Sequence, residues 1–175
     1  MKPTITTDAH HRRIPVSELG VFLLVGLGLE VIQGTLLPAF LRAHVLLVFV
    51  LYVGWRSTPL RGALVGTFFG LLQDYLLGIP LGLNGLSKTL LGFGAGYLSR
   101  WTAPDLGAMR AVLIFGSALL DRGIILGTLL LLGQRISPPP AAELATAALL
   151  TGVLGEVFFR LYDNIRFPPK DFRRL

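Results

Sequence analysis

The sequence contains no cysteine and few charged residues. The lack of cysteine excludes disulfide bonds and thiolate metal sites. Charged residues make up 15% of the 175-residue chain and hydrophobic residues 53%, whereas soluble globular domains carry about 25% charged residues. A soluble domain of this size has too small an interior to cover so much apolar surface. The composition therefore predicts a protein that is embedded in a lipid bilayer.

Long uninterrupted apolar segments are also absent. The longest segments without Asp, Glu, Lys or Arg are Ala43–Trp55 and Tyr75–Ser87, with 13 residues each. A simple spanning helix needs roughly 18 apolar residues. Around most of the apolar segments, however, a window of about 20 residues contains only one or two ionisable groups. This pattern favours several membrane helices that each carry a buried polar side chain.

Proline, glycine and charged residues divide the apolar chain into six predicted spans. The predicted fold class is all-α, a polytopic bundle with a six-helix transmembrane domain over residues 16–162. An N-terminal tail (1–15) and a basic C-terminal tail (163–175) flank this domain. The six spans are Val16–Leu37, Ala39–Trp55, Leu60–Gly78, Leu81–Ser99, Gly107–Gly133 and Ala141–Tyr162.

The placement of Lys and Arg predicts the orientation of the bundle, because cytoplasmic loops of membrane proteins are enriched in these residues. With both termini in the cytoplasm, twelve of the 16 Lys and Arg residues lie on the inner side. Only Arg42 and Arg135 lie outside, and Lys88 and Arg122 fall within spans. The bias also favours an even number of spans, since an odd number would place one basic tail outside.

Several function classes are excluded by the same features. The net charge of +6 would suit nucleic acid, but the basic residues lie between apolar segments and form no patch with aromatic residues. No loop exceeds about ten residues, so no catalytic domain fits on either side of the membrane. Ser87 and Lys88 resemble a Ser–Lys dyad, but adjacent side chains on a helix diverge. We therefore expect a non-enzymatic protein without cofactor or metal.

Ionisable residues at membrane depth are costly and are the main candidates for function. Two interpretations are open: the polar groups pair with one another and hold the bundle together, or they serve transport or partner binding. The ionisable residues are Glu30, Asp74, Lys88, Asp121, Arg122 and Glu156, and Gln33, Gln73 and Asn84 accompany them.

Two consecutive spans carry stripes of small and polar residues at four-residue spacing. Glycines at this spacing allow two membrane helices to approach closely. We expect the two stripes to face each other, with Asp74 and Lys88 at similar depth as an ion pair, and to offer a docking face to a partner. The first stripe is Gly62, Gly66, Gly70, Asp74 and Gly78, and the second is Asn84, Lys88, Gly92 and Gly96.

Other charged residues need partners elsewhere. Asp121 and Arg122 are adjacent and point about 100° apart on a helix, so each needs a partner on another helix. Glu30 is the candidate for Arg122. Glu156 and Arg160 are four residues apart and are predicted to pair locally at the surface of the last span.

The segment from Gly70 to Gly85 resembles the central signature of the MreD family. In that signature a glycine-rich helix leads into Gln-Asp, a short Gly-x-Pro-Leu-Gly turn and a small polar residue. Tyr97, Leu98 and Arg100 resemble the end of the next family helix, whereas Lys88 departs from the pattern, which commonly has an apolar residue there. The matching positions are Gly66, Gly70, Gln73, Asp74, Gly78, Pro80, Gly82 and Asn84.

The resemblance implies a function that the residues alone do not supply. Members of this family are non-enzymatic inner-membrane parts of the elongasome, which builds lateral peptidoglycan in rod-shaped bacteria. The resemblance implies association with the single-pass protein MreC and, through it, with RodA, a class B penicillin-binding protein and MreB filaments. The family is also similar in architecture to the substrate-binding S subunits of energy-coupling-factor transporters, which is an analogy of fold alone.

Two function hypotheses follow from these observations. A scaffold should have glycine-rich grooves that are exposed to lipid, where a partner helix docks, and any interior cavity should be small or plugged. A small-molecule carrier needs a polar pocket in which several groups converge on a ligand. The surroundings of Asp74, Asn84 and Lys88 distinguish between the two.

Overall fold

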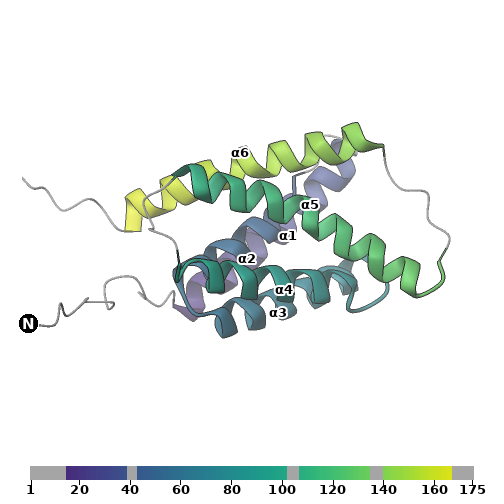
Figure 1. Cartoon of the computed structure of the whole chain (residues 1–175), viewed down its shortest axis with the longest axis horizontal. Coiled ribbons are helices and arrows are strands. Elements are labelled where there is room, and N and C mark those ends of the chain that lie inside the picture. The colour runs from purple at the N-terminus through teal and green to yellow at the C-terminus, as the bar shows by residue number, and fades with distance from the viewer. Residues whose placement is uncertain (1–14, 39–42, 102–106, 135–139, 167–175) are drawn as a thin grey trace, which may run out of the picture.

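The computed structural model describes residues 15–38, 43–101, 107–134 and 140–166, and within these ranges the chain is entirely helical. Six helices follow one another along these ranges, and successive helices run in opposite directions between the two ends of the bundle (Figure 1). Their bounds are α1 Val16–Leu36, α2 Val45–Arg56, α3 Pro59–Leu77, α4 Leu83–Leu98, α5 Gly107–Leu131 and α6 Ala141–Arg166.

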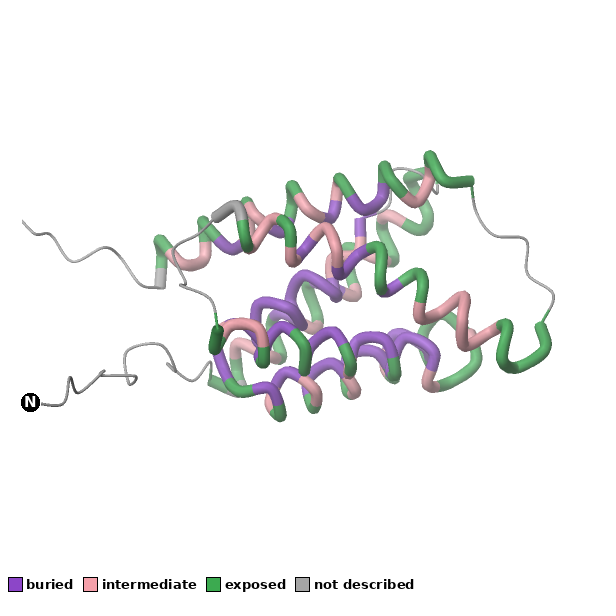
Figure 2. Tube along the Cα trace, in the orientation of Figure 1, coloured by how far each residue is buried: buried purple, intermediate pink, exposed green. Residues whose placement is uncertain are grey.

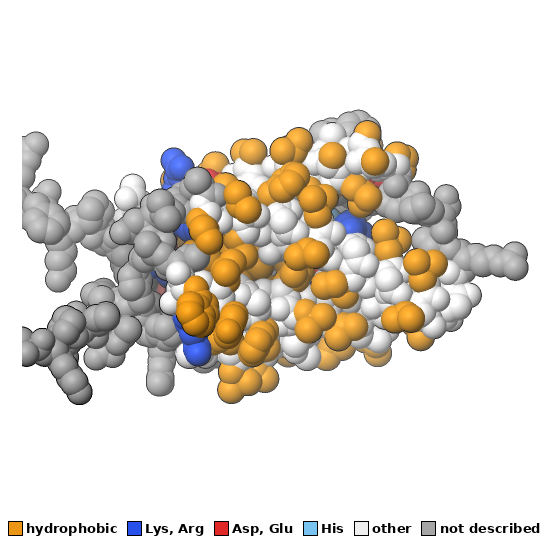
Figure 3. Space-filling view, in the orientation of Figure 1, with side chains coloured by type: hydrophobic (Ala, Val, Ile, Leu, Met, Phe, Trp, Pro, Cys, Tyr) orange, Lys and Arg blue, Asp and Glu red, His pale blue; other side chains and the backbone are white. Residues whose placement is uncertain are grey.

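Three of the described helices are long and apolar enough to cross a membrane. They are α1, α5 and α6, with candidate spans Ser17–Leu36, Met109–Leu131 and Ala141–Ile165. Helix α2 is apolar but has only 12 residues, and α4 has 16. Hydrophobic side chains cover much of the visible surface along the whole bundle (Figure 3). A surface of this kind is suited to lipid as its solvent.

Helix α2 lies in the centre of the bundle. Each residue from Leu46 to Trp55 is buried, because α2 packs against the other five helices. Phe22 of α1, Phe49 and Tyr52 of α2, and Phe158 of α6 form an aromatic cluster with ring centroids 4.9–6.3 Å apart. The outer faces of α1, α5 and α6 remain exposed (Figure 2).

The second predicted span begins too early. Its prediction was Ala39–Trp55, whereas the helix begins at Val45; residues 39–42 lie outside the described ranges. The N–H of Ala43 donates to Gln33 of α1 over 2.7 Å, and the N–H of His44 donates to Thr151 of α6 over 2.9 Å. These side chains satisfy backbone groups that a longer helix would have paired internally.

Turn residues set the bounds of α3 and α4. The Thr58 hydroxyl accepts the N–H of Arg61 over 3.3 Å, and Pro59 stands at the first helical position. Gly78 ends α3 with a φ of 64°, and Gly82 precedes α4 with a φ of 102°. Both values lie in the left-handed region that favours glycine. The predicted glycine–proline turn between these helices is therefore confirmed.

Candidate functional site

The glycine stripes of α3 and α4 face each other, as the sequence predicts. A Cβ added to Gly62 would overlap the carbonyl of Gly92, and one added to Gly66 would overlap the carbonyl of Lys88. The same holds for Gly70 and the carbonyl of Asn84. The two backbones therefore touch over three turns, which only glycine allows.

This internal packing uses both stripes except for Gly78, which is exposed and ends α3. Gly62, Gly66 and Gly70 of α3 are buried, and so are Gly92 and Gly96 of α4. Gly96 packs against Pro59 at the start of α3. A partner helix cannot reach these glycines while α3 and α4 remain paired.

Asp74 lies at the end of the α3 stripe and binds the beginning of α4. Its carboxylate accepts the backbone N–H groups of Gly82, Asn84 and Gly85 over 2.9, 3.1 and 3.3 Å. It also accepts the side-chain amide of Asn84 over 2.8 Å. Helix N-termini favour anions because their first N–H groups have no partner within the helix. Asp74 is fully buried. Because it accepts these N–H groups, its side chain caps the N-terminus of α4.

The predicted direct ion pair between Asp74 and Lys88 is wrong. No contact within 4.0 Å joins the two side chains; instead, the Lys88 ammonium donates to the Asn84 side-chain oxygen over 3.0 Å. Asn84 thus stands between the two charges and binds both. The physical reason is that backbone N–H groups at the start of α4 already surround the carboxylate. Lys88 lies one helical turn further along α4.

A second part of this polar core connects α1, α2 and α3. The Gln73 side-chain amide donates to the Glu30 carboxylate, which also accepts the N–H of Leu46 over 3.4 Å. The Gln73 side-chain oxygen is buried and has no hydrogen-bond partner among the described residues.

Asp121 and Arg122 diverge as predicted. Asp121 is buried and accepts the Ser87 hydroxyl over 2.6 Å, which ties α5 to α4. The predicted pairing of Arg122 with Glu30 is wrong: Arg122 is exposed and donates to the His44 ring nitrogen over 3.1 Å. Glu30 is already occupied by Gln73 and by the first turn of α2, so Arg122 meets the residue that precedes this helix.

Glu156 and Arg160 form the predicted pair, at 2.7 Å, but not as an isolated surface contact. Arg110 of α5 lies 3.6 Å from Glu156 and 3.1 Å from Asp163, and Arg56 of α2 lies 2.5 Å from Asp163. These five residues form an ionic network at the end of the bundle where α6 ends.

Asp163 was missed because it lies outside the last predicted span. The network nevertheless leaves a trace in the sequence: Glu156, Arg160 and Asp163 are spaced by four and seven residues, which places them on one helix face. Tyr52 also donates to Asp163, over 2.9 Å. Helix α6 runs on to Arg166, beyond the predicted Tyr162.

The structure does not form the Ser–Lys dyad. The Ser87 hydroxyl donates to Asp121, while the Lys88 ammonium donates to Asn84, so the two side chains serve different neighbours. Within the described residues no group of three or more His, Asp or Glu side chains is arranged to hold a metal ion. The adjacent histidines of the N-terminal tail, His10 and His11, lie outside the described ranges.

Most polar side chains of the core thus bind one another or the backbone. They include the partners Asp74–Asn84–Lys88, Ser87–Asp121 and Glu30–Gln73.

Comparison with known proteins gives one match. A family model described as the rod shape-determining protein MreD matches residues 11–164, which is most of the chain. No curated protein and no solved structure matches.

Proposed function

The chain belongs to the MreD family of rod shape-determining proteins, and from this we propose that it is a non-enzymatic scaffold of the elongasome. In this function it supports lateral peptidoglycan synthesis and rod cell shape through association with MreC. RodA, the class B penicillin-binding protein and MreB filaments are reached through the same complex. The match over most of the chain is the observation that carries this proposal.

The architecture supports a function exercised within the membrane. Connections between successive helices are short: the longest, residues 132–140 between α5 and α6, has nine residues. Partner contacts therefore have to use helix faces or helix ends. Because the glycine stripes of α3 and α4 pack against each other, we propose that the partner helix packs on the outer faces of α1, α5 or α6. Of the three candidate spans, α1 is the least buried, at 11% of its apolar window.

The polar core supports scaffolding over transport. A carrier would direct its polar groups toward a ligand, whereas here Asp74 and Lys88 both bind Asn84. We propose that the core residues hold the bundle in one arrangement, so that its outer faces keep a fixed shape. Breaking a buried polar contact strands its partner in a medium without water, which gives the core its specificity.

We also propose six spans with both termini in the cytoplasm of the inner membrane. In support, the beginning of α1 and the end of α6 lie at the same end of the bundle (Figure 1). Most Lys and Arg atoms visible in Figure 3 lie at that end as well. An enrichment of this kind is typical of the cytoplasmic side. Alkaline phosphatase fused to the C-terminus should be inactive; an active fusion contradicts the orientation.

Association with MreC is tested by co-purification from membranes. Tagged MreC should retain the chain, and an equally tagged, unrelated single-pass protein should not. Equal recovery on both would contradict the proposal. The full chain should also restore rod shape in cells that lack their own family member, and a variant that is inserted normally but loses MreC should not.

A further inference from the structure

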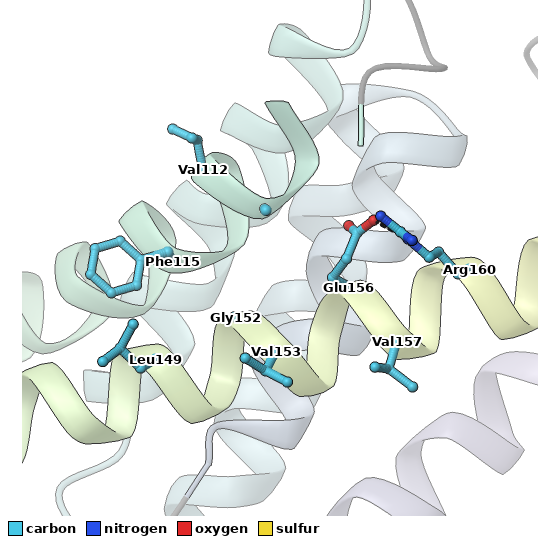
Figure 4. A pocket seen from close by; sticks show the side chains of 9 residues that line it. Val112, Phe115, Leu149, Gly152, Val153, Glu156, Val157 and Arg160 are labelled. Carbon is cyan, nitrogen blue, oxygen red and sulfur yellow. Dashed lines mark hydrogen bonds and ion pairs between the residues drawn. The ribbon is translucent and has the colours of Figure 1, made fainter. Parts of the chain in front are cut away.

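Helices α5 and α6 diverge and leave an open groove between them. Its volume is 520 Å³, and its lining is almost wholly apolar, with Val112 and Phe115 of α5 and Leu149 and Gly152 of α6 among the lining residues. Figure 4 shows Phe115 and Leu149 toward one end and Arg160 with Glu156 at the other. From Leu149 to Arg160 the groove follows α6 for about 16 Å, at 1.5 Å per residue.

The charged end of the groove offers hydrogen-bond donors to an anion. The Nε of Arg160 donates to Glu156 over 2.7 Å, which fixes the guanidinium. Within the described residues its two terminal nitrogens have no acceptor, and the side chain is 68% exposed. Glu156 also lines the groove, and its other carboxylate oxygen is buried. A ligand therefore meets apolar surface along the groove and a cation at its end.

The charges around Arg160 favour an anionic ligand. The ionic network contains three arginines and two carboxylates, a balance of one positive charge, from Arg56, Arg110, Arg160, Glu156 and Asp163. The two carboxylates are largely shielded within the network, with side chains 15% and 16% exposed. Arginine binds phosphate well because its planar donors match phosphate oxygens.

We propose that this groove binds an anionic phospholipid, with one acyl chain between α5 and α6 and the headgroup phosphate on Arg160. A phospholipid supplies both an apolar chain and an anion at its end. A protein helix in the same place would bring no obligatory anion to Arg160. The site concerns the membrane chain itself and does not depend on the association with MreC.

The test is native mass spectrometry of the delipidated full chain with phosphatidylglycerol or phosphatidylethanolamine. The wild type should retain phosphatidylglycerol more strongly. Arg160→Gln should lower that affinity about tenfold, the effect of losing one charge-assisted contact. The matched control is Arg100→Gln, an exposed arginine at the end of α4, which should leave the affinity unchanged.

A second variant tests the apolar part of the groove. Gly152 lines the groove, and a Cβ at this position would meet Phe115 at 3.6 Å, an ordinary contact. Gly152→Leu should reduce lipid retention without changing thermal unfolding. If this variant misfolds, Val112→Trp fills the groove from its rim, where Val112 is 71% exposed.

Three outcomes would overturn the proposal. Equal losses in Arg160→Gln and Arg100→Gln would mean that the anion is bound by general surface charge. Unchanged retention in the groove-filling variants would place the lipid elsewhere. A partner's membrane helix seen in the groove in a structure of the assembled complex would identify a different occupant.

Discussion

The α3–α4 pair and the α5–α6 pair are held together by different means. Helices α3 and α4 touch backbone to backbone along their glycines, and Asp74 caps one helix from the other. Helices α5 and α6 leave a groove between them and are joined near one end by Arg110, Glu156 and Asp163. The first pair is a closed unit and the second is open to its surroundings.

This difference shows two ways of placing charge in a membrane protein. A carboxylate buried between two helices needs partners that are themselves fixed, and the backbone N–H groups at the start of α4 can serve Asp74 because the two helices lie very close. At the end of the bundle, long arginine side chains can reach across a gap and pair with carboxylates. The closed pair therefore supplies rigidity, and the open pair leaves surface for binding.

The largest expected effect comes from separating the closed pair. Gly66→Leu places a side chain on the carbonyl of Lys88, where only backbone motion makes room. We expect the free energy of unfolding in detergent to fall by more than about 4 kcal/mol. Accumulation in the membrane should fall with it, and the measurement is thermal unfolding of the purified protein.

Gly94→Leu on α4 is the matched control. No atom lies within 4 Å of a Cβ at Gly94, and the residue is exposed. Its substitution should change the unfolding free energy by no more than about 0.5 kcal/mol. Equal effects of the two substitutions would mean that the glycines matter for helix flexibility and not for the close approach of α3 and α4.

The next effect in size concerns Asp74. Asp74→Ala leaves several buried N–H groups at the start of α4 without an acceptor, at a cost of about 3 kcal/mol in all. In double-mutant cycles the coupling of Asp74 with Asn84 should be about 1–3 kcal/mol and should exceed the coupling of Asp74 with Lys88. If the coupling of Asp74 with Lys88 is larger than that with Asn84, the two charges form a direct ion pair after all.

The sequence predicted the close pair better than its charge contacts. Four-residue spacing of glycines sets which face of each helix is small, so the facing stripes and the turn at Gly78 and Gly82 were accessible from the pattern alone. The partner of Asp74 was not, because its acceptor oxygens bind backbone N–H groups that every residue possesses. The pattern predicts that Asp74 pairs with another charge, Lys88, whereas in the structure Asp74 binds the start of a helix.

Long-range contacts explain the remaining errors. The first residues before α2 bind Gln33 and Thr151, and Thr151 lies 107 positions from His44. The local sequence pattern does not indicate such a contact, so it predicts a helix that begins already at Ala39. The ionic network likewise joins Arg56, Arg110 and Asp163 from three separate helices.

A smaller effect is expected at the open pair. Asp163→Asn removes the charge that Arg56 and Arg110 share, and should lower the unfolding free energy by about 1–3 kcal/mol. Asn164→Ala, at the exposed neighbouring position, should stay within about 0.5 kcal/mol. A loss at Asp163 as large as that of Gly66→Leu would mean that the ionic network supports the bundle as much as the glycine contact does.

The smallest effect on stability is expected at Arg160. Its side chain is largely exposed, and Arg160→Gln leaves Glu156 near Arg110, so no carboxylate is stranded. Exposed ion pairs contribute about 0–1 kcal/mol, and delipidated Arg160→Gln protein should unfold within that range of the wild type. When phosphatidylglycerol is added, the wild type should gain more thermal stability than the variant, because a ligand stabilises the state that binds it. The difference between the two proteins should then appear only with lipid present. A full loss of stability without lipid would instead make Arg160 a structural member of the ionic network, and the open pair would resemble the closed one.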